Sequence, residues 1–260
     1  MNEEVSQVRR PRGVYLLPNL FTTAALFCGF YAIIAALQGR FEAAAIAVFA
    51  AMFWDGLDGR VARMTHTESA FGAQYDSMAD LVSFGLAPAL IMYEWALGSM
   101  TGMGGFLAKI GWLAAFFYTV MAALRLARFN VQLGHTDKRY FIGLPSPSAA
   151  AIMAGMVWFC TDLGLDGPHM RWPALIVTIG AGALMFSSIL YFSFKQFDLR
   201  GRKPFMTTLV VVLLFVFTSI DPPAVLFLGF LLYGLSGPVL YLTRRWRAHR
   251  RAQNSPDETG

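Results

Sequence analysis

The chain has 260 residues, of which 56% are hydrophobic and only 14% are charged, and its mean hydropathy is +0.51. Soluble domains carry about 25% charged residues, so this composition indicates an integral membrane protein and argues against a water-soluble one. The net charge of +5 does not predict a nucleic-acid partner, because the basic residues lie where membrane topology requires them. The two cysteines, Cys28 and Cys160, are too few for a disulfide framework.

Apolar segments recur along the whole chain. A helix that crosses a membrane needs about 20 mostly apolar residues. Eight segments approach this requirement, at 14–37, 43–63, 71–97, 106–124, 147–163, 172–193, 205–220 and 223–243. The sequence therefore predicts an all-α, polytopic transmembrane bundle of about eight spans.

One domain is the simplest organisation, because the sequence shows no internal repeat. We expect a cytoplasmic N-terminal segment at 1–13, a transmembrane domain at 14–243, and a basic, disordered cytoplasmic tail at 244–260. The N-terminal region does not resemble a cleavable signal peptide, because its apolar run is too long and no small-residue cleavage site follows it.

The positions of the basic residues predict which side of the membrane each loop faces. With both termini in the cytoplasm, 18 of the 21 lysines and arginines lie in cytoplasmic segments. The three on the outside are Arg40, Lys109 and Arg171. This asymmetry is typical of an even number of spans with the N-terminus inside. We expect a multi-pass protein of a bacterial cell (inner) membrane whose active site faces the cytoplasm.

Four aspartates lie at the facing ends of the second and third predicted spans. Asp55 and Asp58 are three residues apart and Asp76 and Asp80 are four apart, so each pair shares one helix face. The short connection at 63–72 makes the two helices antiparallel neighbours, which brings all four carboxylates together. Ionisable groups at membrane depth usually mark function, and oxygen-only ligands suit Mg²⁺ or Mn²⁺, with Ca²⁺ as a further possibility. The sequence predicts a divalent-cation site that could clamp a diphosphate.

Glycines and one arginine flank the aspartates. Gly56, Gly59 and Gly72 each weaken a helix by about 1 kcal/mol relative to alanine, a cost tolerated where a ligand approaches closely. Close helix packing is an equal alternative for Gly56. Arg63 can reach a phosphate, or it can serve as a membrane-interface anchor.

These residues also form a longer pattern. It is Asp55-x-x-Asp58-Gly59-x-x-Ala62-Arg63, followed after eight residues by Gly72-x-x-x-Asp76-x-x-x-Asp80. The pattern resembles the signature of the CDP-alcohol phosphatidyltransferases, and all eight signature positions match without a gap. Members of this family move a phosphatidyl group, or a related phosphoalcohol, from a CDP-linked donor to an alcohol and release CMP.

The resemblance implies a role for each matching residue. Asp55, Asp58 and Asp76 would bind one metal, Asp55, Asp76 and Asp80 would serve a second where one is bound, and Asp80 would be the general base. The CDP-donor site would include Gly59, Ala62, Arg63 and Gly72, joined by Asn19 and Thr22 from the first span. The family also tends to be homodimeric, which implies a second copy of this chain as a partner.

Further segments resemble the branch of this family that uses L-serine as acceptor. They are Pro18-Asn19-Leu20-Phe21-Thr22-Thr23, Asp80-Leu81-Val82-Ser83-Phe84-Gly85, Arg125-Leu126-Ala127-Arg128-Phe129-Asn130, Gly143-Leu144-Pro145-Ser146-Pro147 and Ser193-Phe194-Lys195. The resemblance covers about 14–200 and leaves two extra C-terminal spans, 205–243, outside it. It implies transfer of phosphatidyl from CDP-diacylglycerol to L-serine.

The serine carboxylate needs a cationic partner. The candidates are Arg125, Arg128 and Lys195 at predicted cytoplasmic helix ends, where each could instead be a topology anchor. Two rival functions remain: the same reaction with glycerol 3-phosphate or an inositol (phosphate) acceptor, and a cation transporter with the aspartates as its ion site. A transporter would place its carboxylates near the bilayer midplane, often between repeated halves.

Overall fold

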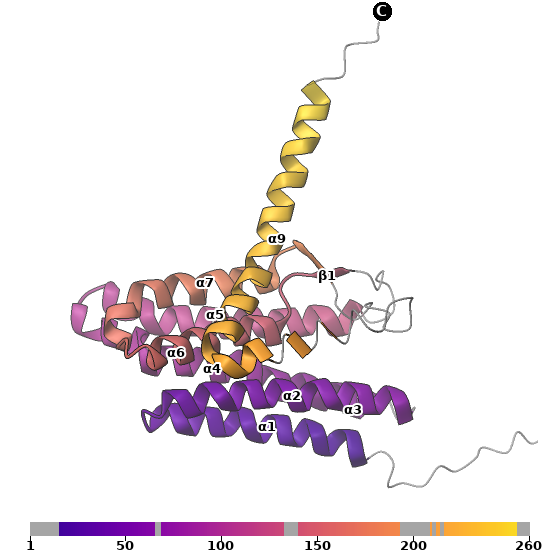
Figure 1. Ribbon diagram of the computed structural model, residues 1–260, viewed down its shortest axis with the longest axis horizontal. Coiled ribbons are helices and arrows are strands. Elements are labelled where there is room, and N and C mark those ends of the chain that lie inside the picture. Colours follow the sequence, from indigo (N-terminus) through magenta and orange to yellow (C-terminus); the bar gives the residue numbers. More distant parts are fainter. Residues whose placement is uncertain are drawn as a thin grey trace, which may run out of the picture.

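The computed structural model describes residues 16–65, 69–132, 140–192, 209, 212–213 and 216–253. Its long helices are α1 (Leu16–Leu37), α2 (Phe41–Thr65), α5 (Leu107–Gln132) and α9 (Pro222–Gln253). Shorter ones are α3 (Ala70–Asp80), α4 (Ala87–Trp95), α6 (Ser146–Asp162) and α7 (Arg171–Phe186). Helices α1 to α7 run roughly alongside one another, and α9 rises away from them (Figure 1). The predicted helical bundle is confirmed.

Small side chains allow the first two helices to pack closely. Ala32, Ala35, Ala44 and Ala45 are fully buried where α1 meets α2. Membrane helices commonly associate through such small residues, because their backbones can then approach one another. This contact holds the Asp55 end of α2 against the start of α1.

The third predicted span is not one continuous α-helix. After α3, the chain widens into a π-helical segment, η2 (Leu81–Leu86), and then continues as α4. A 3-10 segment, η3 (Leu97–Met103), follows at an angle of 47°. The π-helical turn begins directly after Asp80, so it lies beside the predicted site.

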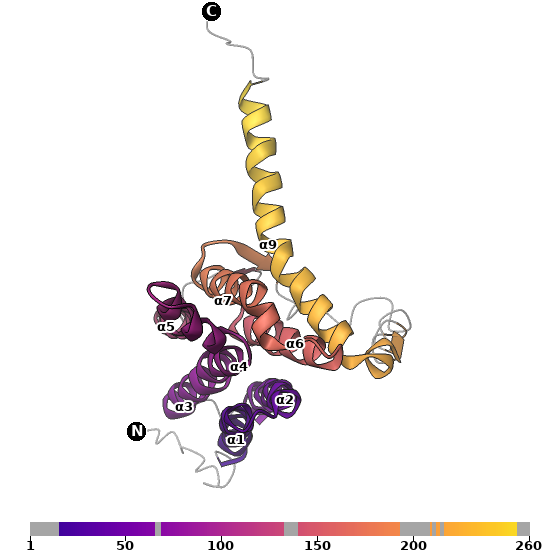
Figure 2. The ribbon, with the colours of Figure 1, turned by 90° about the vertical axis from the view of Figure 1, so that its left-hand side faces the viewer.

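Helix α6 forms the centre of the bundle. It contacts α2, α4, α7 and α9, and nearly all of its residues from Ser146 to Val157 are buried (Figure 2). A short 3-10 segment, η4 (Gly167–Met170), leads from it to α7. The apolar character of this helix therefore reflects its central position.

Two short strands depart from the all-α prediction. Strand β1 (Tyr140–Ile142) pairs antiparallel with β2 (Leu190–Phe192), with Phe141 opposite Tyr191. The pair ties the chain before α6 to the chain after α7. No local sequence pattern signals this pairing, because the two strands are far apart in sequence.

Helix α9 extends beyond the predicted last span. The sequence places the end of that span at 243 and a disordered tail from 244, but α9 continues through Gln253. The structure thus differs from the prediction over residues 244–253. Residues 1–15 and 254–260, together with half of the predicted seventh span at 205–220, lie outside the described residues.

Three described helices are long and apolar enough to cross a membrane, at Asn19–Leu37, Leu107–Val131 and Pro222–Thr243. The bent pair Ala70–Trp95 and Leu97–Met103 makes a fourth if it is one span. Helices α6 and α7, which correspond to two further predicted spans, have 17 and 16 residues, fewer than the roughly 20 that a full crossing needs. The chain is a helical membrane protein with three described helices able to cross a membrane, or four if the bent pair is one span.

Candidate active site

Three of the four signature aspartates converge. Asp55 from the second half of α2 meets Asp76 and Asp80 from α3, and one carboxylate oxygen of each lies within 4.8 Å of the others. Asp55 and Asp80 are close enough for their charges to interact. All three side chains are half-buried. The helix-face spacing and the antiparallel arrangement predicted from the sequence produce this cluster.

The fourth aspartate has a different environment. Asp58 is buried, and its Oδ2 accepts a 2.7 Å hydrogen bond from the hydroxyl of Thr22 on α1, which is buried as well. Asp58 is not among the three carboxylates that come within 4.8 Å of one another. Thr22, predicted at the CDP-donor site, is therefore in direct contact with a predicted metal ligand.

The start of α3 lies against the start of α1. Ser69 caps α3 by accepting a hydrogen bond from the Gly72 amide at 3.0 Å. A Cβ atom added at Gly72 would lie 3.4 Å from Asn19 Oδ1, so these two predicted donor-site residues are neighbours. A Cβ at Gly56 would meet no atom within 4 Å among the described residues, so helix packing does not require that glycine.

Arg125 supplies positive charge beside the carboxylates. It lies on α5, and its charge interacts with that of Asp80. Its Nη1 donates a 2.7 Å hydrogen bond to Ser146 Oγ, at the fully buried first position of α6. Its Nε is buried and has no hydrogen-bond partner within the part of the chain that the structure describes. Arg125 therefore keeps a buried donor that is available to a further partner.

Arg128 is held by main-chain carbonyls. Its guanidinium donates to Phe186 O at 3.2 Å, Ile142 O at 3.1 Å and Ser187 O at 3.4 Å. It also lies over the Phe186 ring, with Cζ 5.0 Å from the ring centroid. Arg128 thus satisfies carbonyls at the C-terminal end of α7 and joins them to β1.

Three predicted site residues receive little structural description. Lys195 lies outside the described residues. The backbones of Ala62 and Arg63 belong to α2, but their side chains are not described. Gly59 is half-buried, one position after Asp58 on α2.

Several polar contacts near the site were not predicted. Ser77, between Asp76 and Asp80 on α3, bonds reciprocally with Asn130 on α5, with Asn130 Nδ2 donating to Ser77 Oγ at 3.1 Å. Ser146 belongs to the Gly-Leu-Pro-Ser-Pro motif, which does not by itself predict the hydrogen bond from Arg125. The hydroxyl positions are present in the sequence, but their partners lie on helices distant along the chain.

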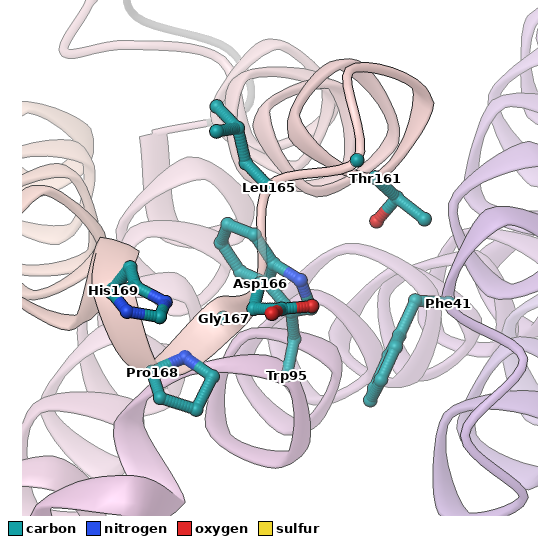
Figure 3. A pocket seen from close by; sticks show the side chains of 9 residues that line it. Phe41, Trp95, Thr161, Leu165, Asp166, Gly167, Pro168 and His169 are labelled. Atoms are coloured by element: carbon teal, nitrogen blue, oxygen red, sulfur yellow. The ribbon is translucent and has the colours of Figure 1, made fainter.

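A second hollow lies at the other end of the bundle, away from the aspartates. A cavity of about 420 Å³ lies among Phe41, Trp95 and the loop that carries Asp166 and His169 (Figure 3). Phe41 begins α2, about 21 Å along the helix from Asp55 at 1.5 Å per residue. Asp166 and His169 are both exposed, so this cavity lacks the buried charge of the aspartate site.

The donor set at the aspartate site fits a divalent cation. The cluster offers oxygen ligands only, as Mg²⁺ and Mn²⁺ prefer, and two helices bring three carboxylates within a few ångströms. Three negative groups this close repel one another, and a divalent cation would offset that repulsion. Asp55, Asp76 and Asp80 would hold one such ion.

Comparison with known proteins agrees with this chemistry. The chain is 34% identical over 222 residues to the CDP-diacylglycerol--serine O-phosphatidyltransferase of Helicobacter pylori (strain ATCC 700392 / 26695), covering 85% of this chain and 90% of that protein. The protein of the same name from Mycobacterium leprae (strain TN) is 30% identical over 248 residues, covering 92% and 79%. That from Bacillus subtilis (strain 168) is 32% identical over 180 residues, covering 69% and 92%.

A family profile also matches. The profile of the CDP-alcohol phosphatidyltransferases covers residues 15–218, which reaches past the limit near 200 that the sequence motifs set. It spans both helices that carry the aspartates as well as Arg125. The resemblance predicted from the aspartate signature is confirmed, and the chain belongs to the CDP-alcohol phosphatidyltransferase family.

Proposed function

We propose that this chain transfers the phosphatidyl group of CDP-diacylglycerol to the hydroxyl of L-serine, giving phosphatidylserine and CMP. The observation that carries the proposal is the convergence of Asp55, Asp76 and Asp80 in the spacing of the family signature. Family membership supports the reaction class, and the names of the three relatives support serine as acceptor.

The aspartates have unequal roles in this proposal. Asp55, Asp58 and Asp76 hold one divalent cation, Mg²⁺ or Mn²⁺, and Asp55, Asp76 and Asp80 serve a second where one is bound. The bound cation supplies charge neutralisation at the diphosphate and so makes CMP a better leaving group. The hydrogen bond from Thr22 fixes the orientation of Asp58, which lies outside the three-carboxylate group.

Asp80 acts as the general base. Its carboxylate accepts the proton of the serine hydroxyl, and the serine oxygen forms a bond to the phosphorus that carries diacylglycerol. The bond from that phosphorus to the bridging oxygen breaks, and CMP leaves with the electron pair. General bases contribute about 10²–10⁴-fold to such reactions.

Arg125 is the cation that binds the serine carboxylate. It lies close enough to Asp80 for their charges to interact, and its buried Nε has no hydrogen-bond partner among the described residues. Arginine binds carboxylates with paired hydrogen bonds, so it can orient the acceptor as well as attract it. Arg128 has its guanidinium on three carbonyls, so we assign it a structural role. Lys195 stays a candidate from the sequence.

The donor site lies at the start of α1 and α3. Asn19, Gly59, Ala62, Arg63 and Gly72 line the cytidine diphosphate, with Thr22 beside them through Asp58. Support comes from the neighbouring positions of Asn19 and Gly72 and from the open space over Gly56. The acyl chains of the donor extend into the bilayer.

The distribution of basic residues supports a topology with both termini in the cytoplasm and the aspartates at the cytoplasmic face. In this arrangement the shorter helices and the segment near 205–220 complete about eight crossings of a bacterial inner membrane. The catalytic domain is 14–243, and the chain works as a homodimer, as its family tends to.

An acceptor panel tests the function. Purified protein receives CDP-diacylglycerol and Mg²⁺ or Mn²⁺, and CMP release is measured with L-serine, glycerol 3-phosphate, inositol and inositol phosphate in turn. We expect release with serine alone, and its loss when EDTA removes the metal. Release with a different alcohol would overturn the serine assignment, and no release with any alcohol would favour the cation-transporter alternative.

Asp80→Asn tests the base. The amide cannot accept the proton, so we expect turnover to fall by about 10²–10⁴-fold while CDP-diacylglycerol still binds. Donor binding measured by equilibrium titration distinguishes a lost base from a collapsed site. Turnover equal to that of the native protein would remove Asp80 from this role.

A further inference from the structure

The helix that carries Asp76 and Asp80 changes its winding directly after Asp80. In η2 the amide of Ala87 donates to Val82 O, five residues back, where an α-helix would use a residue four back. Short π-helical segments inside α-helices occur often at functional sites. Contacts with neighbouring helices hold this turn, and its winding affects the direction of the helix that carries Asp76 and Asp80.

Pro88 gives a local cause for the turn. A proline has no amide hydrogen, so it cannot donate to the carbonyl of Phe84 four residues earlier, and its ring crowds that carbonyl. The Phe84 carbonyl is nevertheless satisfied, because the hydroxyl of Tyr118 on α5 donates to it at 3.0 Å. Tyr118 and Phe84 are both fully buried, so water cannot take over this hydrogen bond.

A second hydroxyl attaches the turn to α1. Ser83, which is buried, donates to Ala25 O at 3.1 Å. Helix α1 can approach this closely because Gly29 has no side chain: a Cβ atom there would collide with Ser83. The π-helical turn is therefore held from two sides, by α5 through Tyr118 and by α1 through Ser83.

The winding of this turn determines where α3 points. An α-helix has 3.6 residues per turn, so gaining or losing one residue in the winding rotates one side relative to the other by about 100°. If η2 reverted to α-helix, Asp76 and Asp80 would swing by about that angle relative to α4. Their carboxylates would then leave Asp55, which sits on a separate helix.

We propose that Tyr118 and Ser83 are positioning residues for Asp80: they hold the π-helical turn that directs the Asp80 carboxylate, together with that of Asp76, toward Asp55. The inference rests on the proposed function for its kinetic consequences. It rests on the structure alone for its consequences on metal binding. Neither residue contacts the reacting atoms in this proposal.

Tyr118→Phe and Ser83→Ala, made in the full chain, test the proposal. The matched controls lose the same kind of bond elsewhere: Tyr191→Phe removes a buried hydroxyl that donates to Gly234 O at 2.9 Å, and Thr178→Val removes one that donates to Ala174 O at 2.7 Å. The measurements are Mn²⁺ affinity by electron paramagnetic resonance of the free ion, Tm, and kcat and KM for CMP release.

For Tyr118→Phe we expect Mn²⁺ affinity and kcat each to fall about tenfold, within the range seen when a residue supporting a metal ligand is removed. The KM for serine stays within about twofold, because Arg125 is unchanged. Ser83→Ala shows a smaller effect in the same direction. Tyr191→Phe and Thr178→Val lower the Tm but leave Mn²⁺ affinity unchanged.

Either of two results in the single variants would overturn the proposal. One is native Mn²⁺ affinity and kcat in Tyr118→Phe. The other is an equal loss in Tyr191→Phe, which would show a general stability effect. In an Asp80→Asn background the effect of Tyr118→Phe on Mn²⁺ binding should shrink, because the two residues act through one group; full additivity would contradict the proposal.

Failure of the proposed function would look different. If the native protein binds Mn²⁺ but releases no CMP with serine, the serine assignment is wrong, and the Mn²⁺ comparison still decides the role of Tyr118. If the native protein shows no Mn²⁺ binding, the metal site is wrong, and kcat with whichever acceptor is active decides between Tyr118→Phe and Tyr191→Phe.

Discussion

Two arginines lie one turn apart on α5, within a single sequence motif, and their surroundings differ. Arg128 donates to three main-chain carbonyls and lies over an aromatic ring. Arg125 donates to one serine hydroxyl, keeps a buried Nε without a described partner, and interacts with the charge of Asp80. Arg128 therefore uses its donors to hold main-chain carbonyls together, whereas Arg125 keeps a donor that none of its described neighbours uses.

The difference follows from what each guanidinium faces. Arg128 faces the C-terminal end of α7, where the last carbonyls of a helix have no intrahelical donors. Gly143, with φ of +81°, lets β1 approach that end, because a side chain there would collide with the Met185 carbonyl. Arg125 faces the start of α6 and the carboxylate cluster. Its described hydrogen-bond partner is the Ser146 hydroxyl, and no main-chain carbonyl is among its described partners. The comparison teaches that charge alone does not identify a ligand-binding arginine.

Replacing Arg125 gives the largest effect that the comparison predicts. Arg125→Gln removes the cation that we assign to the serine carboxylate, so kcat/KM for serine should fall about 100-fold, or about 2.7 kcal/mol, mainly through KM. The measurement is CMP release over a serine titration. Arg125→Lys restores the charge without the paired donors and should recover part of the loss. If Arg125→Gln kept the native serine KM, Arg125 would not bind the serine carboxylate, and the two arginines would not differ in function.

Replacing Arg128 should affect stability instead. Arg128→Gln loses charge-assisted bonds to three exposed or part-buried main-chain carbonyls, so we expect the free energy of unfolding to fall by about 2–3 kcal/mol, measured as thermal denaturation in detergent. The serine KM of the folded protein should change less than about twofold. Arg128→Lys should not restore stability, since a single ammonium cannot reproduce a planar fork across three carbonyls. A raised serine KM with native stability would reverse the assignment.

The aspartate cluster could be predicted because its geometry is local. Spacings of three and four residues fix one face of each helix, and a short connection fixes the antiparallel pairing of α2 and α3. Asp55, Asp76 and Asp80 meet as predicted. The position of Asp58 was not predictable, because it depends on Thr22 from α1, 36 positions earlier.

Other features depend on contacts that the sequence pattern does not show. Hydropathy marks α6 and α7 as candidate spans, but it does not show that α6 is the buried centre of the bundle. The π-helical turn has a local cause in Pro88, but its carbonyl is satisfied by Tyr118 on another helix. The division of labour between Arg125 and Arg128 likewise depends on α6 and α7, which come later in the chain.

The smallest predicted effect concerns the one side chain that holds Arg125. Ser146 Oγ is fully buried and accepts from Nη1, so Ser146→Ala leaves the guanidinium without its described anchor but keeps its charge. Loss of one such hydrogen bond costs about 1 kcal/mol, so the serine KM should rise about fivefold with kcat nearly unchanged.

Ser148→Ala, which truncates another buried serine two positions along α6, is the matched control and should leave the serine KM unchanged. Ser146→Ala should also lose its effect in an Arg125→Gln background, because Ser146 acts only through that guanidinium. If both serine variants raise KM alike, or if the two losses add in the double variant, α6 contributes through packing. In that case, the hydrogen bond between Arg125 and Ser146 would not explain why Arg125 and Arg128 differ.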